Sequence, residues 1–391
     1  MTEKLFYADS HLDSMEAVVL ACEAVENGYA VILDRTVFFP EGGGQPADTG
    51  IIAGIRVTDV QEQDGLIRHI LTEPIAVGSQ VSGRLDWDRR FSCMQNHSGE
   101  HIVSGLVHSR FGYSNVGFHM GSEAITMDFN GRITADELKE VELQANCIVT
   151  ANLRITADFP EPDELSSMKY RSKIEIDGPV RIVTIPGVDR CACCAPHVSF
   201  TGEIGIIKLI GSEKYKGGTR VSMLCGFRAL KDYEKRSEQI AALSVRLSSK
   251  PDDVAEAVER LMLEMEGIKE KKNRLQRELY ARRAEDETVG RRNLLAIEED
   301  LTPAELRYLA NAYLERLEGV AAVFTGDEQQ GYQYVIGSGD RDCRELGKSC
   351  NRALNGRGGG SAQMVQGSVK AGREEIEKWF DDAVQDRHTA V

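Results

Sequence analysis

The stretch Met94-Gln95-Asn96-His97-Ser98-Gly99-Glu100-His101 is the part of the chain around which the other motifs can be ordered. Its two histidines stand four residues apart, in a segment whose apolar residues have helical spacing. On a helix, side chains at i and i+4 lie on one face, with about 5–6 Å between their Cβ atoms. Two imidazoles so placed can share one metal ion, and zinc is the commonest fit. The stretch therefore predicts half of a zinc site, whose other ligands lie elsewhere in the chain.

A second cluster of potential ligands is Cys191-Ala192-Cys193-Cys194-Ala195-Pro196-His197. Cys193 and His197 repeat the four-residue spacing, and one thiolate with three imidazoles completes a tetrahedral set. Cys191 and Cys194 compete for the thiolate position. Four protein ligands usually indicate a structural ion, whereas a catalytic metal needs an exchangeable position for substrate or water. The spacing leaves both roles open.

The composition restricts the class of protein. The chain has 391 residues, of which 41% are hydrophobic and 28% charged, which is typical of a soluble globular protein with two or three domains. No apolar run approaches 18 residues and no signal peptide is recognisable, so we expect a cytoplasmic protein without a membrane span. Nine mostly scattered cysteines agree with a reducing compartment. A Walker A sequence and a Gly-x-Ser-x-Gly elbow are both missing, so neither a nucleotide triphosphate nor a serine nucleophile is implied.

Four segments with different patterns predict an α+β protein. Residues 1–85 contain short runs typical of strands and predict a small β-barrel. Residues 86–228 mix helix and strand patterns and contain both ligand clusters. Residues 229–290 have apolar residues at heptad spacing with one break, which predicts an antiparallel coiled-coil hairpin. Residues 291–391 predict a small α/β domain.

Basic residues are concentrated in one part of this acidic chain. The formal net charge of −15 excludes a protein that coats nucleic acid indiscriminately. Residues 269–283 nevertheless carry seven basic and two acidic side chains, and we expect Lys271, Lys272 and Arg274 to contact nucleic acid. A solvated helix face is the alternative. The glycine-rich residues 355–361, which include Arg357, predict a phosphate-binding loop, with an open solvent loop as the alternative.

Three motifs, in this order, carry a resemblance to a known family: Gly42-Gly43-Gly44-Gln45-Pro46, His97-x-x-x-His101, and Cys193-x-x-x-His197 followed by Thr201-Gly202-Glu203-Ile204-Gly205. From about Phe6 to Leu230 the chain resembles the editing domain of alanyl-tRNA synthetase. It resembles more closely the free-standing relatives of that domain, the AlaX-type alanyl-tRNA editing proteins. The C-terminal part resembles the DHH-associated domain at the end of the synthetase. With no aminoacylation domain before the editing part, we expect the long form of the trans-editing factor.

The resemblance implies a hydrolase that removes a wrong amino acid, mainly serine and sometimes glycine, from tRNA for alanine. It implies that Thr36 recognises the serine hydroxyl and that Gln45 lines the catalytic site. We expect the substrate to lie against the Gly42–Gly44 loop. From their position before His97, Arg89 and Arg90 are candidates to meet its terminal phosphates, with surface salt bridges as the alternative. The partner would be mischarged tRNA, and we expect a homodimer through the C-terminal region. One zinc ion per chain is implied, with the ligands His97, His101, Cys193 and His197.

One motif departs from the family pattern. The usual Cys-Gly-Gly-Thr-His reads Cys193-Cys194-Ala195-Pro196-His197 here, so the roles of the two glycines and the threonine are not carried over. Two other functions compete with the hydrolase: a non-catalytic tRNA-binding or synthetase-associated module with a structural zinc, and an editing relative for threonyl-tRNA. Retention of Thr36, Gln45 and all four ligand types favours the enzyme, and the glycine motif favours the alanyl side. The preference between serine and glycine, the role of the metal and the tRNA elements that are read stay open.

Overall fold

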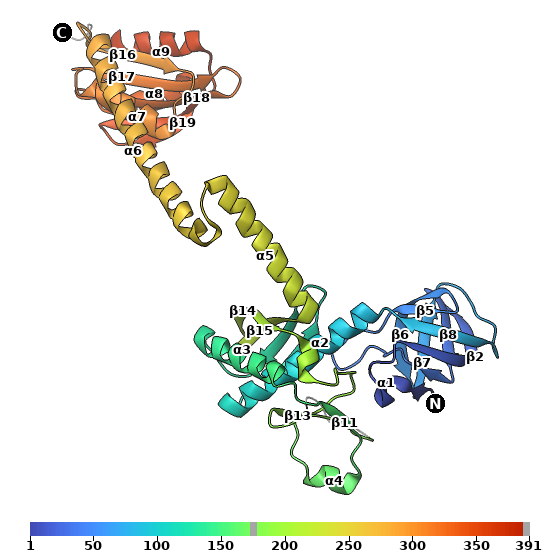
Figure 1. Ribbon diagram of the computed structural model, residues 1–391. Helices are drawn as coiled ribbons and strands as arrows, with labels where there is room; N and C mark the ends of the chain where they lie inside the picture. The colour runs from blue at the N-terminus through green and yellow to red at the C-terminus, as the bar shows by residue number, and fades with distance from the viewer. Residues whose placement is uncertain (173–177, 386–391) are drawn as a thin grey trace. The chain divides into compact units, whose positions relative to one another are not determined.

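The computed structural model describes residues 1–172 and 178–385, and the chain forms two compact units. The first unit is Met1–Ala242 and the second is Leu243–Val391, so the boundary lies inside helix α5 (Gly226–Leu247). Both units contain helices and strands, which confirms the expected mixed class (Figure 1). The described part of the chain has no helix that is long and apolar enough to cross a membrane. The finer division into four segments stays a prediction.

The first unit begins with a closed six-stranded barrel. Several of its strands alternate buried and more exposed side chains, because successive residues of a strand point to opposite faces. In β7, for example, Ile67, His69 and Leu71 are buried and face the barrel core. In barrel order the strands are β2 (Ser14–Val25), β3 (Gly28–Leu33), β7 (Leu66–Leu71), β6 (Ile55–Gln63), β5 (Gly50–Ile52) and β8 (Gln80–Leu85). Outside the barrel order are β1 (Glu3–Lys4), α1 (Leu5–Ala8) and β4 (Arg35–Thr36).

The loop between β4 and β5 carries the glycine motif and touches the next part of the unit. Gly43 and Gly44 have positive φ values of 60° and 81°, a conformation that side chains with a Cβ rarely adopt. A Cβ on Gly44 would lie 2.6 Å from the ring of Phe118 in strand β9 (Asn115–Met120). The amide of Met120 donates to the Gly44 carbonyl at 3.3 Å. Glycine at this position therefore allows the barrel loop to pack directly on β9.

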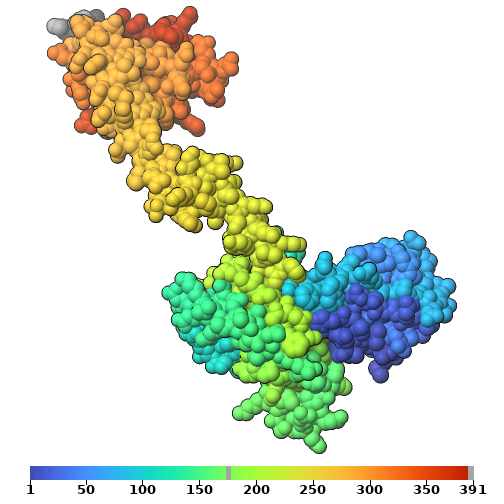
Figure 2. Space-filling model, viewed as in Figure 1, coloured from blue at the N-terminus to red at the C-terminus, as the bar shows by residue number. Residues whose placement is uncertain are grey.

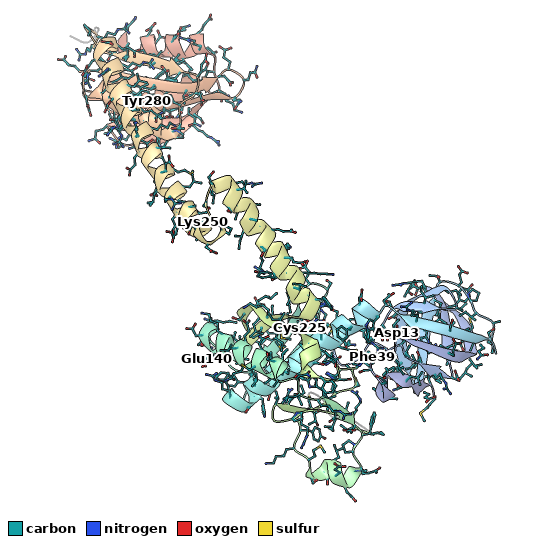
Figure 3. All side chains as sticks on the ribbon, in the orientation of Figure 1. Asp13, Phe39, Glu140, Cys225, Lys250 and Tyr280 are labelled. Carbon is teal, nitrogen blue, oxygen red and sulfur yellow. The ribbon has the colours of Figure 1, made fainter. Side chains whose placement is uncertain are left out.

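Helix α2 (Trp87–Phe111) lies at the centre of the rest of the first unit (Figure 1). Its residues from Cys93 to Gly105 are all buried, because other elements cover several of its faces. A Cβ on Gly99 would lie 2.4 Å from the Cys225 sulfur, so α2 packs closely on the end of β15 (Gly218–Cys225), where Figure 3 labels Cys225. The four-stranded sheet beside α2 has the order β14 (Ile207–Tyr215), β15 (Gly218–Cys225), β10 (Ile125–Phe129) and β9. Helix α3 (Ala135–Thr150) begins with the capping box of Thr134 and Glu137.

A small sheet positions the second ligand cluster. It consists of β11 (Thr156–Asp158), β12 (Ile182–Ile185) and β13 (Asp189–Ala192). Because β12 and β13 pair antiparallel, the chain just before β12 lies beside the chain just after β13. The Cys193 amide donates to the Arg181 carbonyl at 3.0 Å. Two short helices flank this region, α4 (Pro162–Ser167) and η1 (Thr201–Ile204). In the space-filling view the barrel, in blue, lies directly against this second part of the unit (Figure 2).

The second unit is a sheet with helices, preceded by the long helix α6 (Val254–Glu287). The sheet order is β16 (Leu294–Glu298), β17 (Val320–Asp327), β18 (Gly331–Ser338), β20 (Met364–Val369) and β19 (Arg357–Gly360). The remaining elements are η2 (Pro251–Asp253), α7 (Pro303–Leu314), α8 (Cys343–Ala353) and α9 (Arg373–Gln385). Leu261, Ile268 and Leu275, at heptad positions of α6, are 45%, 62% and 50% exposed. Pairing of α6 in a coiled coil therefore stays a prediction.

The structure corrects one expectation in this unit. The sequence predicts a loop at residues 355–361, but Arg357–Gly360 forms the edge strand β19. This stretch pairs antiparallel with β20, in a register that runs from Arg357 opposite Ser368 to Gly360 opposite Val365. Glycine patterns predict strands poorly, since glycine lacks a side chain that packs on a sheet. Some of the backbone groups expected to bind a phosphate are thus hydrogen-bonded to β20.

Candidate functional site

Four buried side chains of the first unit form a compact donor cluster. The ligand atoms of His97, His101, Cys193 and His197 all lie within 4.8 Å of one another. The Cys193 sulfur lies 3.5 Å from His97 Nε2 and 3.4 Å from His197 Nε2. In a tetrahedral site with Zn–S near 2.3 Å and Zn–N near 2.05 Å, the edge between sulfur and nitrogen is about 3.5 Å. The spacing and the chemistry of the donor set therefore fit one zinc ion.

Each of the three imidazoles is held by a hydrogen bond at its other ring nitrogen. Nδ1 of His97 donates to Gln45 Oε1 at 3.0 Å, and Nδ1 of His101 donates to Asp189 Oδ2 at 2.9 Å. Nδ1 of His197 and Ser98 Oγ hydrogen-bond at 3.0 Å. This arrangement leaves each Nε2 for the metal, as partners at the second nitrogen do in many zinc sites. The cluster is thus oriented before any ion binds.

The electrostatics of the cluster favour a cation. Burial opposes ionisation of the Cys193 thiol, but His97 and His197 lower its pKa well below the usual range. Burial lowers the pKa of His197 to about 3, so its imidazole is neutral and able to ligate. For His101, burial lowers the pKa, but the hydrogen bonds with Asp189 and Cys193 outweigh burial and raise it. The Cys193 thiolate and the Asp189 carboxylate therefore lie beside the imidazoles, and a metal ion would balance the negative charge of these two groups.

Asp189 links the cluster to the partly buried Arg171. Its two oxygens accept from Arg171 Nε at 2.7 Å and Arg171 Nη2 at 2.8 Å. Burial raises the pKa of Asp189, but His101 and Arg171 together lower it below its ordinary value. Asp189 and His101 also form a second group of potential ligands with Cys191. Burial raises the pKa of the Cys191 thiol, so Cys193 is the better thiolate of the two.

A pocket of about 520 Å³ opens beside the cluster. Three aromatic rings, two glycines of the barrel loop and the three clustered cysteines contribute to its walls. The pocket contains one arginine, Arg181, which comes from the start of the β12–β13 hairpin. The residues that line it are Tyr7, Gly43, Gly44, His97, His101, Val116, Gly117, Phe118, Phe159, Ser172, Pro179, Arg181, Cys191, Ala192, Cys193 and Cys194. A substrate held there would have its reacting group next to the ligand atoms.

The barrel residues expected at the site lie in different places. Gly43 and Gly44 line the pocket, whereas Gly42 and Gln45 lie just behind the lining. Thr36 is completely buried in the barrel, where its hydroxyl accepts from the Phe38 amide at 3.0 Å and hydrogen-bonds His69 Nε2 at 2.8 Å. Thr36 is therefore not among the lining residues, and both of its hydrogen-bond partners belong to the barrel. Phe39, three residues after Thr36, is labelled at the edge of the barrel in Figure 3.

The expected cationic residues do not belong to the pocket lining. Arg89 Nη2 donates to the Ala47 carbonyl at 3.1 Å and is not a lining residue. Lys271 and Lys272 are exposed on α6, beside a shallow apolar groove formed by the same helix. Arg274, also exposed, lies 3.9 Å from Glu278, and Arg357 is exposed on β19. These four residues of the second unit stay predicted contacts of tRNA.

Several residues of the site were not identified from the sequence. Asp189 precedes the cysteine cluster by two residues, and this position is the one sequence signal that could have indicated its role as a partner of a ligand. Ser98 is next to His97, but a serine in a helix has many other roles. Tyr7 and Arg181 lie far from every motif, and the fold brings them to the pocket. Contacts across the unit can be found only from the structure.

Comparison with known proteins gives matches along the whole chain. The family of class II (A) tRNA synthetases matches residues 5–89, and the second additional domain of threonyl and alanyl tRNA synthetases matches residues 180–222. The alanyl-tRNA editing protein Aarsd1 of Danio rerio is 27% identical over 93% of this chain and 93% of its own length. The alanyl-tRNA editing protein AlaX-L of Pyrococcus horikoshii is 28% identical, with 98% of each chain covered.

Synthetases match as well, but this chain corresponds to part of them. The alanine–tRNA ligase of Halorubrum lacusprofundi is 31% identical over 87% of this chain and 38% of the ligase. A solved C-Ala domain of alanyl-tRNA synthetase from Aquifex aeolicus matches 24% of this chain and 87% of that domain, with 23% identity and a TM-score of 0.22. The resemblance predicted from the three motifs is confirmed: over more than nine-tenths of its length this chain is similar to alanyl-tRNA editing proteins.

Proposed function

We propose that this chain is a trans-editing hydrolase that deacylates mischarged tRNA for alanine at one bound zinc ion. Ser-tRNA is the main substrate in this proposal and Gly-tRNA a second one. The observation that carries it is the 520 Å³ pocket whose wall contains the ligands His97, His101 and Cys193. A purely structural zinc needs no such opening. The names of the full-length relatives, which are alanyl-tRNA editing proteins, support the same substrate.

His97, His101, Cys193 and His197 would hold the zinc, which would polarise the ester carbonyl or activate a water molecule. Gln45 orients His97 by accepting from its Nδ1. The Gln45 amide nitrogen is buried and has no partner among the described residues, so it is a donor that remains for a group next to His97. The Gly43–Gly44 backbone forms the wall on the barrel side, where the absence of side chains lets the ester approach closely.

Discrimination against alanine requires a polar partner for the serine hydroxyl. A site that hydrogen-bonds this hydroxyl rejects alanine strongly, because alanine would leave the polar group unpaired. We retain Thr36 as the candidate reader. Since its hydroxyl already bonds His69 and the Phe38 amide, direct recognition requires exchange of one of these bonds for the substrate. If no exchange takes place, Thr36 supports the barrel wall and another group reads the hydroxyl.

A second function is favoured by one feature of the cluster. All four donors are buried protein side chains, and closed four-ligand sets are typical of structural zinc. In that case the chain would bind tRNA, or a synthetase, without hydrolysing the ester. Only the hydrolase releases the amino acid from the tRNA, so an assay of hydrolysis distinguishes the two functions.

The decisive experiment is deacylation of Ser-tRNA, Gly-tRNA and Ala-tRNA by the zinc-loaded full chain. We expect hydrolysis of Ser-tRNA, slower hydrolysis of Gly-tRNA and little of Ala-tRNA. His101→Ala removes one ligand and should abolish the activity, whereas His108→Ala, an exposed histidine of the same helix, should leave it unchanged. No hydrolysis of any aminoacyl-tRNA by the zinc-loaded protein would refute the enzyme and leave the binding module.

The rest of the chain supports tRNA binding and a reducing compartment in this proposal. Exposed Lys271, Lys272 and Arg274 on α6, together with Arg357 on β19, would contact the tRNA backbone. All nine cysteines are free, as in proteins of the cytoplasm. The exposed apolar positions of α6 would be covered by a coiled-coil partner helix, and the C-terminal region would form a homodimer.

A further inference from the structure

Arg181 is a buried cation whose bonding capacity is incompletely used. Its side chain is 6% exposed, and it lines the pocket. Nη1 donates to the carbonyls of Cys193 at 3.1 Å and Ala195 at 2.8 Å. Nε is buried and has no hydrogen-bond partner within residues 1–172 and 178–385, and no ion pair joins Arg181 to a carboxylate there. A buried guanidinium without a charge partner is electrostatically costly, and an anion in the pocket would stabilise it.

The bound metal increases this need for an anion. Arg181 Nη1 contacts the backbone of Cys193, whose sulfur belongs to the candidate ligand set. One thiolate and three neutral imidazoles around Zn²⁺ give a net charge of +1. With zinc bound, Arg181 would therefore lie beside a cationic centre. A negatively charged ligand in the pocket would restore the balance.

Two aromatic rings continue the pocket on the other side of Arg181. The Arg181 guanidinium carbon lies 5.0 Å from the ring centroid of Tyr7. Tyr7 in turn contacts Phe159 edge to face, with 5.5 Å between centroids, and both rings line the pocket. Phe159 is 49% exposed and so is accessible to a ligand. Flat apolar surfaces of this kind bind nucleobases by stacking.

Along the wall of the pocket, the aromatic pair of Phe159 and Tyr7 is followed by Arg181, which in turn contacts the ligand cluster through Cys193. An aminoacylated terminal adenosine of tRNA has the matching order of base, ribose with its 5′-phosphate, and ester. Resting on the function proposed above, we propose that Arg181 binds the 5′-phosphate of the terminal nucleotide, while Tyr7 and Phe159 receive its base. The guanidinium then gains an anionic partner, and Nη1 keeps the Cys193–Ala195 turn in place. Arg181 would couple the position of the phosphate to that of a metal ligand.

The proposal is tested with two non-hydrolysable analogues of the substrate. They are 3′-serylamino-3′-deoxyadenosine with and without a 5′-phosphate, and their affinities for the zinc-loaded full chain are measured by calorimetry. A charge-assisted hydrogen bond predicts that the phosphate improves binding at least tenfold. In Arg181→Gln this ratio should fall to about one. Arg181→Lys, which keeps the charge and loses Nε, should give an intermediate ratio, and it serves if the glutamine variant fails to fold.

Arg341 provides a matched control. It also donates to two backbone carbonyls, of Ala383 and Val384, and its Nε is also buried and unpartnered among the described residues, but it belongs to the second unit. Arg341→Gln should keep the wild-type ratio. Tyr7→Leu should weaken both analogues by about the same factor, roughly tenfold for loss of one stacked base, and leave the ratio unchanged.

The outcomes separate this inference from the proposed function. If the wild type hydrolyses Ser-tRNA but binds both analogues equally, or binds neither, the Arg181 site is refuted and the enzyme stands. If Arg181→Gln weakens both analogues in parallel and lowers the zinc content measured by atomic absorption, Arg181 acts only by positioning the Cys193 turn. If no aminoacyl-tRNA is hydrolysed by the wild type, the proposed function itself fails.

Discussion

Asp189→Asn tests directly whether the hydrogen bonds around the metal cluster are arranged for metal binding. Asp189 Oδ2 accepts from both His101 Nδ1 and Arg171 Nη2, and Oδ1 accepts from Arg171 Nε at 2.7 Å. An asparagine has one oxygen and one NH₂ group in these positions. If the oxygen keeps the His101 bond, the NH₂ group meets the Arg171 Nε–H, donor against donor. In the opposite orientation it meets the His101 Nδ1–H.

The expected effect is a loss of zinc affinity rather than a loss of the fold. Removal of a hydrogen-bond partner of a metal-binding histidine typically costs 10–100-fold in affinity, or about 1.4–2.8 kcal/mol. Competition with a chromogenic chelator measures this change, and atomic absorption gives the zinc content per chain. At saturating zinc we expect deacylation of Ser-tRNA to recover in part, since all four ligands are still present.

Asp128→Asn is the matched control for this variant. Asp128 pairs with Arg220 through two bonds of 2.6 and 2.8 Å, in the same geometry, but it contacts no ligand histidine. Zinc affinity should be unchanged in this control. An Asp189→Asn protein that binds zinc within twofold of the wild type would refute the idea that Asp189 orients His101. An equal loss in both variants would show that the effect is general destabilisation.

Three further predictions concern the barrel and the basic helix. Burial lowers the pKa of His69 to about 4, against 6.5 in an unfolded chain, so the unfolded state binds more protons between these values and stability falls as pH drops from 6.5 to 4. The loss is at most about 3 kcal/mol, and it should vanish in His69→Gln but persist in His108→Gln, as measured by urea unfolding at each pH. Thr36→Val should reduce the preference of deacylation for Ser-tRNA over Ala-tRNA if Thr36 reads the hydroxyl, whereas a fall in melting temperature with unchanged preference would restrict Thr36 to its bond with His69. Charge reversal of Lys271, Lys272 and Arg274 on α6 should weaken tRNA binding in a filter assay at moderate salt. Unchanged affinity would show that this helix is not part of the tRNA-binding surface.

The candidate metal ligands could be predicted because each pair of them stands close together in the sequence. The spacing of His97 and His101 on one helix, and of Cys193 and His197 after one hairpin, fixes which side chains can reach a common point. What the sequence left open was the choice among three neighbouring cysteines. The geometry favours Cys193, whose sulfur lies within 4.8 Å of the ligand atoms of all three histidines. The closed barrel and the edge strand β19 depend on pairing between distant strands, which periodicity does not specify.

The pocket wall illustrates a different limit. Tyr7 and Arg181 are separated by more than 170 positions, and neither has a neighbour that suggests chemistry. They meet because the N-terminal segment of the barrel packs against the start of the β12–β13 hairpin. A residue with a motif, such as Thr36, can conversely lie where its hydroxyl already has partners. A motif therefore identifies the type of group that a family uses, whereas the packing decides which groups face the substrate. On this basis Arg181, which has no motif, lines the pocket and keeps an unpartnered Nε, whereas the hydroxyl of Thr36 lies in the barrel with two partners.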